Sequence, residues 1–595
     1  MISKAIHAFQ KKQFDLALSL LTQQCERSPE KYHLLTLVLE SLNRIEKAFE
    51  SICEGVNNFP NDQRLIYQLC QFGKKHGVSL AAAELIKKQN CAVLSNEVAY
   101  AYLSLLIDCQ LLQRALAFDE LLSSSLKQTT NYYWYLCELH KQIADHRKAL
   151  DTAKIAVTIF PDDFHLNYRL ASLLQEMGKA HEALPIYQTL LKLQPKNPDL
   201  NYAIACAYHS IQDLSQTEQY LIRVLELAPN YVPAHESYTK LMWEQNRNND
   251  YLKTYSRSRE LVGLHPQVLH SEVGQLLKFD KLDAAIELSS QALKQFPTIP
   301  EIQHMQSILL DKRGNTEASI AILEKLVQTY PYHSRFSLDL ANHYLVNGEL
   351  HKADLLLQKP LQADPHNQEL WAYQSIAWKL LNDDRFAWLN DYNKIVGQFM
   401  LPTPKGYNSL SSFLSELQST LLTLHEKEKK QPLDQSVRIG TQTDGHLLLL
   451  ENKVIQAFKW AYNECILKYF ASFPTDLNHP LYRRHTGLFK TNGSWSVQLQ
   501  QGGFHTNHIH PRGWISGPAY IKIPENMYAN DEQRSGWLKL GETCLGLGEK
   551  ESVDLALCPE EGMVIFFPSY LWHGTYTLTS SSPRMTIPCD ILPIT

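Results

Sequence analysis

The 595-residue sequence contains no long apolar segment. A membrane-spanning helix needs about 18 or more consecutive apolar residues, and no such run occurs. Residues 1–7 also lack the apolar stretch that opens a secretory signal peptide. We therefore expect a cytoplasmic protein with no membrane partner, although secretion by a route that needs no such signal stays open.

Paired cysteines and an excess of positive charge are missing as well. The eleven Cys are scattered, odd in number and never spaced as Cys-x-x-Cys, so reduced and mostly buried thiols are the simplest account. Lys and Arg number 57 against 62 Asp and Glu, a net charge of -5. This balance gives no reason to expect a nucleic-acid partner.

Apolar residues are present in the proportion that folded proteins use. The hydrophobic share is 44% and the charged share 20%, which fits a globular protein. A chain of 595 residues is too long for one hydrophobic core, so we expect several domains or a repeat array.

Prolines in the first two thirds of the chain recur at a nearly constant interval. They stand at Pro161, Pro195, Pro229, Pro266, Pro297, Pro331 and Pro365. Most steps are 34 residues, and the steps of 37 and 31 around Pro266 sum to two such intervals. A 34-residue helix-turn-helix period is the signature of tetratricopeptide repeats.

Small and turn-forming residues occur at matching offsets within these repeats. They are Ala171, Gly178, Ala183 and Tyr187 in one unit, and Ala341, Tyr344, Gly348 and Ala353 in another. Helices that cross closely need Ala at the crossing, Gly allows the turn and Pro ends the second helix. We predict a solenoid of about a dozen helical pairs over residues 1–398, degenerate before residue 131.

A solenoid of this kind has a concave groove suited to an extended peptide or a partner helix. The alternative is a structural array whose groove binds nothing in particular. Because the array precedes a segment with catalytic features, we favour binding of a protein or peptide. The sequence does not indicate the oligomeric state.

The composition changes after the repeats. Pro402, Pro404 and Gly406 interrupt the helices, and 410–424 restores an amphipathic pattern, so we predict a linker helix over 399–431. In the domain predicted over 432–595, residues 452–470 have helical spacing. Short apolar runs at 494–499, 515–523, 563–567 and 585–591 follow and favour a small antiparallel barrel or sandwich.

Three histidines are candidate metal ligands. His508 and His510 stand at i and i+2, which a strand would turn to one face, and His573 follows the apolar run 563–567. We predict that these three bind one metal ion. His505 has two interpretations that we weigh equally: a structural histidine, or a polar group that supports the site.

The order of motifs in the last third resembles that of the 2-oxoglutarate/Fe(II)-dependent oxygenases. It is most similar to a bacterial group in which a prolyl-hydroxylase-like double-stranded β-helix follows tetratricopeptide repeats. The matching stretches are QPLDQS at 431–436, GTQT at 440–443, SWSV at 494–497, GGFH at 502–505, HIHP at 508–511, GWIS at 513–516, GWLKLG at 536–541 and FPSYLWHG at 567–574. The resemblance implies an α+β multidomain protein, with an all-α superhelix before a jelly-roll domain.

The resemblance also implies Fe(II), 2-oxoglutarate and O2 as cofactor and cosubstrates, with the three histidines as catalytic residues. His510 stands where the family pattern has Asp or Glu, so iron is the leading metal and zinc the competitor. Arg584, eleven residues after His573, would grip the distal carboxylate of 2-oxoglutarate. Thr586 and Tyr520 would assist it. The alternative for Arg584 is a surface salt bridge.

The implied activity is hydroxylation of a protein or peptide that the repeats recruit, by a dioxygenase. Two alternatives stay open: an inactive oxygenase-like domain on a scaffold for protein–protein interaction, and a three-His metal dioxygenase that does not use 2-oxoglutarate. A glycosyltransferase is less favoured, because no Gly-rich strand-to-helix turn follows the repeats.

Overall fold

The computed structural model describes residues 2–23, 26–87, 94–247, 249–426, 435–525, 527 and 531–594. Residues 431–434, the start of the first matching stretch, lie outside the described residues. The chain divides into two compact units, Met1–Leu173 with Ile594–Thr595, and Leu174–Pro593. The domain limits predicted at residues 398 and 431 stay a prediction.

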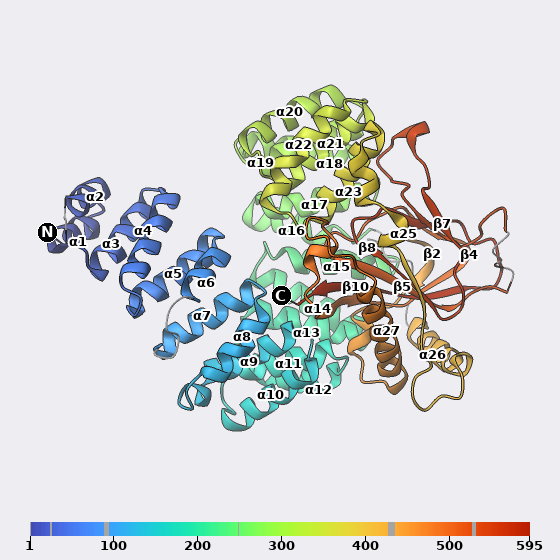
Figure 1. Ribbon diagram of the computed structural model, residues 1–595, viewed down its shortest axis with the longest axis horizontal. Helices are drawn as coiled ribbons and strands as arrows, with labels where there is room; N and C mark the ends of the chain where they lie inside the picture. The colour runs from blue at the N-terminus through green and yellow to red at the C-terminus, as the bar shows by residue number, and fades with distance from the viewer. Residues whose placement is uncertain are drawn as a thin grey trace. The chain divides into compact units, whose positions relative to one another are not determined.

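The first unit consists of consecutive antiparallel helices (Figure 1). Asp62 and Asp145 precede two of them and accept hydrogen bonds from the backbone of the first turn, which satisfies otherwise unpaired N–H groups. The helices are α1 (Ile2–Gln10), α2 (Phe14–Thr22), α3 (Pro29–Ser41), α4 (Ile45–Asn58), α5 (Gln63–His76), α6 (Ser79–Ile86), α7 (Asn96–Asp108), α8 (Leu112–Leu121), α9 (Thr130–Gln142), α10 (His146–Ile159) and α11 (Phe164–Glu176), the last of which continues into the second unit.

The second unit begins with further helices of the same kind and confirms the predicted all-α repeats. Ala341 and Ala353 are fully buried, Gly348 takes a left-handed φ of +80°, and Pro365 follows the helix that ends at Ala363. The helices are α12 (Ala180–Leu193), α13 (Pro198–Ser210), α14 (Leu214–Leu227), α15 (Val232–Glu244), α16 (Lys253–Val262), α17 (Pro266–Lys278), α18 (Leu282–Gln295), α19 (Pro300–Lys312), α20 (Thr316–Thr329), α21 (Ser334–Val346), α22 (Leu350–Ala363), α23 (Gln368–Leu381), α24 (Asp384–Leu389) and α25 (Tyr392–Ile395).

The C-terminal part of this unit is built from antiparallel strands and two longer helices. In the described residues the larger sheet has the order β1-β8-β5-β10-β4-β2, with β3 beside β10, and the smaller has the order β7-β6-β9. This arrangement confirms the predicted jelly-roll. The elements are β1 (Gly397–Met400), α26 (Leu410–His425), β2 (Val437–Gln442), α27 (Lys453–Ala471), β3 (Phe489–Ser494), β4 (Val497–His505), β5 (Ile515–Lys522), β6 (Leu538–Leu540), β7 (Leu555–Leu557), β8 (Met563–Pro568), β9 (His573–Thr575) and β10 (Arg584–Pro593), with short 3-10 helices η2 (Leu126–Gln128), η3 (Leu447–Leu449), η4 (Tyr482–Arg484) and η5 (Gly548–Lys550) elsewhere in the chain.

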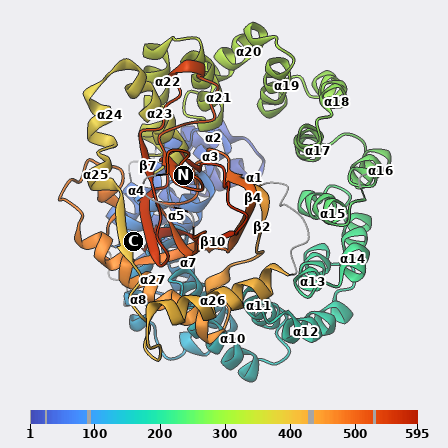
Figure 2. The same ribbon diagram turned by 90° about the vertical axis from the view of Figure 1, so that its right-hand side faces the viewer.

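The repeats and the jelly-roll share one hydrophobic core. A single cluster of buried residues includes Ala341 and Trp378 of the repeats, Phe458 of α27 and Phe566 of β8. Figure 2 shows α12 to α23 curving round the sheet. The second unit is therefore one packed body in which the last repeats are part of the support of the sheet.

Two local expectations need correction. The run 494–499 is not one strand, because β3 ends at Ser494 and β4 begins at Val497; between them Ser496 N–H donates to Thr443 Oγ1 at 2.9 Å. The strand expected to carry His508 and His510 is not formed, because β4 ends at His505 and His508 takes part only in an isolated bridge. The strand β1, which pairs with β8, was not anticipated. No described helix is both long and apolar enough to cross a membrane.

Candidate metal centre

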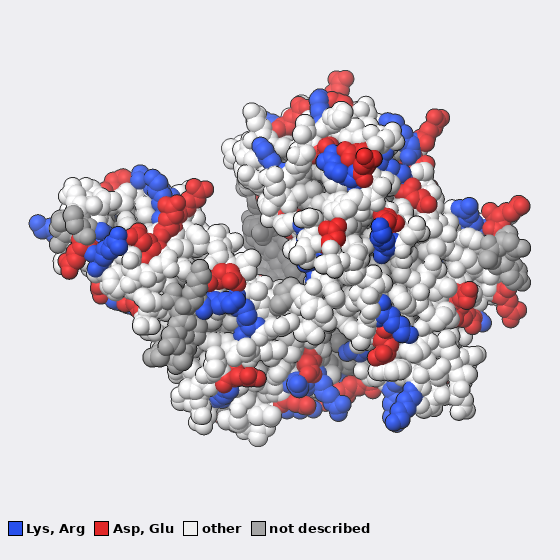
Figure 3. Space-filling model, in the orientation of Figure 1, with Lys and Arg blue, Asp and Glu red and all other residues white. Residues whose placement is uncertain are grey.

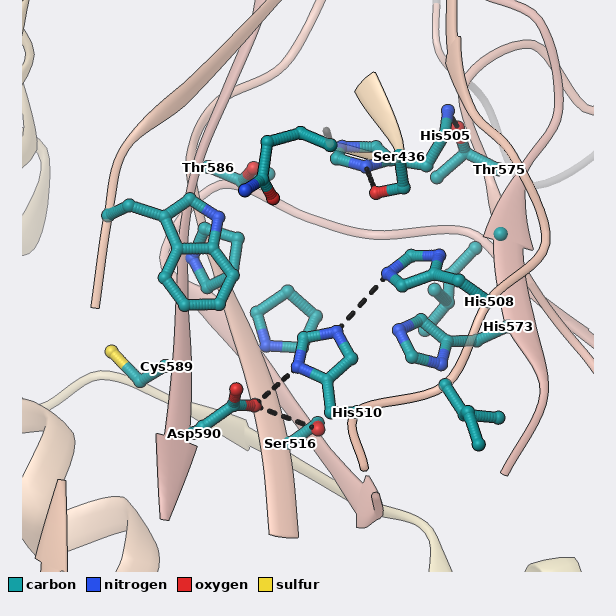
Figure 4. Close-up of a pocket in the computed structure, with 18 of the residues that line it drawn as sticks. Ser436, His505, His508, His510, Ser516, His573, Thr575, Thr586, Cys589 and Asp590 are labelled. Atoms are coloured by element: carbon teal, nitrogen blue, oxygen red, sulfur yellow. Dashed lines mark hydrogen bonds and ion pairs between the residues drawn. The ribbon is translucent and has the colours of Figure 1, made fainter. Parts of the chain in front are cut away.

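The structure brings the three predicted metal ligands together (Figure 4). His508 and His573 form an antiparallel backbone pair, with N–H to O=C distances of 2.9 and 3.0 Å. Side chains of directly paired residues project to the same side, so the two rings meet. Their nearest nitrogens and those of His510 all lie within 4.8 Å of one another. The metal-binding role itself stays a prediction.

Close backbone packing makes this convergence possible. The segment that carries His510 lies against the turn before His573, where His510 N–H donates to Ser569 O at 3.0 Å. A Cβ at Gly513 would lie 2.3 Å from Ser569 Oγ, and one at Gly574 would lie 2.9 Å from the carbonyl oxygen of His505. The two glycines therefore allow an approach that any larger residue would prevent.

Each of the three rings donates its Nδ1 hydrogen away from the centre. The acceptors are Thr506 O for His508 at 2.8 Å, Leu571 O for His573 at 2.9 Å and Asp590 Oδ1 for His510 at 2.6 Å. Because those oxygens only accept, each Nδ1 carries the hydrogen and each Nε2 carries a lone pair. When all three rings are neutral, three Nε2 lone pairs thus point toward one another.

This donor set fits a divalent cation. The Nε2 atoms of His508 and His510 are 3.2 Å apart. Between two neutral rings, whose hydrogens are on Nδ1, that contact is not a hydrogen bond; a protonated His510 would donate its Nε2 hydrogen to His508. Two imidazole nitrogens that bind one ion at about 2.1 Å each lie roughly 3.0–3.4 Å apart, depending on the coordination geometry. The observed separation falls in this range.

The protonation of the histidines follows from burial and from one carboxylate. Burial, reinforced by His510, lowers the pKa of His508 to about 3. Burial and the neighbouring His508 also lower the pKa of His573 well below its usual value. Burial lowers the pKa of His510 too, but the charge of Asp590 outweighs it and the pKa is raised. His508 and His573 are therefore neutral at pH 7 and free to bind a cation.

The candidate cosubstrate residues line the same cavity, whose volume is about 690 Å³. Arg584 is 2% exposed, donates to the carbonyl oxygen of Gly536, and has no hydrogen-bond partner for Nε in the described part of the chain. Burial lowers its pKa. Tyr520 lies with its ring centre 5.6 Å from Arg584 Cζ, and Thr586 is two residues along the same strand. A buried guanidinium with an unused donor is suited to an anionic ligand.

Sequence reasoning did not find Asp590, which also lines the cavity. It lies on β10, six residues after Arg584 and on the same face, roughly 20 Å along a strand. The even spacing between Arg584 and Asp590, which places both on one face of a strand, is the sequence signal that could have pointed to Asp590. His505 lines the cavity as well, where its Nδ1 contacts Ser436 Oγ at 3.0 Å, and it is not one of the three clustered ligands.

Comparison with protein families identifies both parts of the chain. Residues 493–590 match the model of a family described as "Putative 2OG-Fe(II) oxygenase". Residues 8–232 and 310–375 match two tetratricopeptide-repeat models. The chain therefore combines tetratricopeptide repeats with a C-terminal domain of this oxygenase family.

Individual known proteins add little. No curated protein matches the sequence. Among solved structures, MamA (41-end) from Desulfovibrio magneticus RS-1 is 14% identical, with a TM-score of 0.26, and covers 28% of this chain and 94% of its own. Yeast Tom70 is 13% identical, with a TM-score of 0.30, and covers 66% and 97%. At such TM-scores these resemblances say nothing about function.

Proposed function

We propose that this chain of tetratricopeptide repeats and a 2OG-Fe(II) oxygenase domain is a 2-oxoglutarate- and Fe(II)-dependent dioxygenase that hydroxylates a protein or peptide. The observation that carries the proposal is the convergence of three Nε2 lone pairs in a cavity that also holds the buried guanidinium of Arg584. The lone pairs are suited to a cation and the guanidinium to an anion, which a metal ion and a dicarboxylic acid would supply.

His508, His510 and His573 would hold the metal through Nε2. Their hydrogen bonds to fixed acceptors keep the rings oriented, so little reorganisation is needed on binding. When bound, Fe(II) supplies the activation of O2 that is coupled to decarboxylation of 2-oxoglutarate to succinate and carbon dioxide. Zinc, which also accepts imidazole ligands, is the competing metal.

Arg584 would bind the distal carboxylate of 2-oxoglutarate with its unused Nε–H. The hydroxyl groups of Tyr520 and Thr586, which line the same cavity, could donate further hydrogen bonds. Both side chains are almost fully buried, as is Phe567, which packs with its ring centre 4.8 Å from that of His573. Tyr520, Thr586 and Phe567 therefore form a buried part of the cavity wall.

A protein or peptide substrate is supported by the repeats, which are an interaction architecture. The cavity is within the size range of sites that enclose small molecules, so it has room for a side chain beside the cosubstrate. On the face that Figure 3 shows, Lys and Arg are interspersed with Asp and Glu. This face therefore has no basic patch of the kind that binds nucleic acid.

The test is release of succinate by the full-length protein, purified without oxygen, loaded with Fe(II) and supplied with 2-oxoglutarate and air. We expect slow release without substrate, and none from a His573→Ala variant. If the protein binds iron but never releases succinate, even with candidate peptides, the scaffold alternative is favoured. If it consumes O2 without 2-oxoglutarate, the three-His dioxygenase alternative is favoured. Arg584, buried without a carboxylate partner in the described residues, speaks against the latter.

A further inference from the structure

Asp590 is the single acidic residue among the described residues that line the cavity. Its side chain is 15% exposed and that of His510 13%. Figure 4 shows the carboxylate between His510 and Ser516, with Oδ1 accepting from His510 Nδ1 at 2.6 Å and from Ser516 Oγ at 3.1 Å. The carboxylate thus stands directly behind one of the three candidate metal ligands.

The three candidate ligands differ in the group that accepts their Nδ1 hydrogen. His508 and His573 donate Nδ1–H to neutral backbone carbonyl oxygens. Only His510 donates to a negative charge. A short, charge-assisted hydrogen bond of this kind draws the Nδ1 hydrogen outward and makes Nε2 a stronger electron donor.

His510 also stands at the position where the two-His-one-carboxylate site of non-haem iron oxygenases has its carboxylate. Three neutral imidazoles alone would leave the full charge of a divalent metal unbalanced in a buried site. We propose that Asp590 acts through His510 as a positioning residue that returns the missing negative charge to the metal centre. The inference rests on the metal-binding part of the proposed function.

The carboxylate is held in place by a closed circuit of hydrogen bonds. Ser516 Oγ, which contacts Asp590, lies 2.9 Å from Ser569 Oγ. The carbonyl oxygen of Ser569 accepts the backbone N–H of His510. Ser516 and Ser569 are 2% and 0% exposed. One serine pair therefore fixes both the ligand and the carboxylate, as expected of a pre-organised site.

The test replaces Asp590 by Asn in the full-length protein, which keeps the size of the side chain and removes its charge. Co(II) is the probe, titrated in the absence of 2-oxoglutarate and followed by its visible absorption. We expect Asp590→Asn to bind Co(II) about 10–100-fold more weakly, the usual cost of losing such a partner. Glu561→Gln is the matched control: it removes one charge from an exposed ion pair with Lys522 in the same domain, and should leave the affinity unchanged.

A second pair of variants separates charge from structure. His510→Asp places a carboxylate directly at the metal and removes the imidazole through which Asp590 acts. Asp590→Asn should therefore weaken Co(II) binding much less in the His510→Asp background than when residue 510 is His. An equal loss in both backgrounds would show that Asp590 does not act through His510, and that result would overturn the inference.

The outcomes also distinguish the inference from the proposed function. If the unaltered protein binds no Co(II), the metal site itself is absent and both fall. If the unaltered protein binds Co(II) tightly and Asp590→Asn binds it equally well, the charge-supplying role is refuted while the metal site stands. Thermal unfolding of each variant without metal shows whether a lost affinity comes from a lost fold.

Discussion

The ammonium group of Lys379 lies 2.6 Å from the carboxylate of Asp554 and joins α23 to the segment before β7. Both side chains are less than one fifth exposed, and Tyr392 Oη donates to the same carboxylate at 2.8 Å. A Cβ at Gly541 would lie 2.3 Å from Asp554 Oδ2, so glycine is needed beside the pair. The end of the repeat array is therefore fastened to the domain that holds the cavity.

The same connection recurs earlier in the second unit. Lys179 pairs with Glu451 at 2.7 Å, and Lys240 of α15 contacts Asp444 at 3.1 Å. Asp444 follows β2, whose last residue, Gln442, lines the cavity. Part of the repeat surface thus binds the chain's own oxygenase domain, close to the cavity that a recruited substrate would have to reach.

Loss of one clustered histidine should abolish tight metal binding. We expect His573→Ala to retain no divalent metal after dialysis, because removing one of three imidazoles leaves two neutral ligands in a buried site. The measurement is metal content per chain by elemental analysis, together with the rise of Tm that bound metal causes.

The matched control is His505→Ala. His505 lines the same cavity but is outside the ligand cluster, so this variant should keep its metal and the associated rise of Tm. Equal metal content in the two variants would contradict the assignment of His573.

Arg584 should determine the affinity for 2-oxoglutarate. Replacement by Met keeps much of the apolar length and removes the charged donor, which we expect to weaken binding by about 2–3 kcal/mol, or roughly 30–150-fold. The dissociation constant is measured by calorimetry with Mn(II) in the site. Arg534→Met, which changes an exposed arginine bonded to Tyr576, should have no such effect. Unchanged affinity in Arg584→Met would remove the cosubstrate role.

Two glycines should respond to alanine with opposite signs. At Gly517 of β5 a Cβ would lie 2.3 Å from Tyr462 Oη and 2.5 Å from Phe566 Cδ1, so Gly517→Ala should destabilise the fold by about 1–3 kcal/mol. At Gly274, inside α17, an added Cβ would have no atom within 4 Å apart from its own helix backbone. Gly274→Ala should therefore stabilise the fold by about 0.5–1 kcal/mol. Thermal unfolding measures both, and shifts of the same sign would contradict the packing described here.

Much of the fold could be predicted because its signals are local. A proline every 34 residues, with Ala and Gly at fixed offsets, defines the helical pairs without knowledge of distant contacts. The strands β5, β8 and β10 fall in the short apolar runs predicted at 515–523, 563–567 and 585–591, and the histidines of the cluster lie in a dense motif. Strand geometry was the argument for grouping His508 with His510, but the structure joins His508 to His573 by an isolated backbone bridge outside β4. The binding of a metal by these residues stays a prediction.

What could not be predicted depends on long-range contacts. β1 is four residues long and exists through its pairing with β8, more than 160 residues away. The even spacing from Arg584 places Asp590 on the cavity face of β10, but its pairing with His510, 80 residues earlier, has no signal in the sequence. The break at Trp495 reflects pairing of β10 with β3 on one side of it and with β4 on the other. None of these can be derived from a local pattern.

Stability should fall between pH 6.5 and 4 because of His425 at the end of α26. This residue is 5% exposed, and its two nitrogens contact Ser496 Oγ and Thr441 Oγ1, each at 2.9 Å. Burial lowers its pKa from 6.5 to about 4. The unfolded chain therefore takes up a proton near pH 6.5 that the folded protein accepts only near pH 4. The stabilisation is complete above pH 6.5 and is lost as the pH falls toward 4, by about 3 kcal/mol in total.

The variant His425→Gln isolates this contribution. Glutamine can still form one donor and one acceptor contact with the two hydroxyl groups but does not titrate, so the fall in Tm between pH 7.5 and 4.5 should be smaller than in the parent protein. His351→Gln, which changes an exposed histidine of α22, should behave like the parent. If His425→Gln lost as much stability on acidification as the parent does, the neutral, buried state of His425 would not be the cause. Acid sensitivity would then have to come from other buried histidines with lowered pKa values, such as His508 and His573, or from the paired carboxylates.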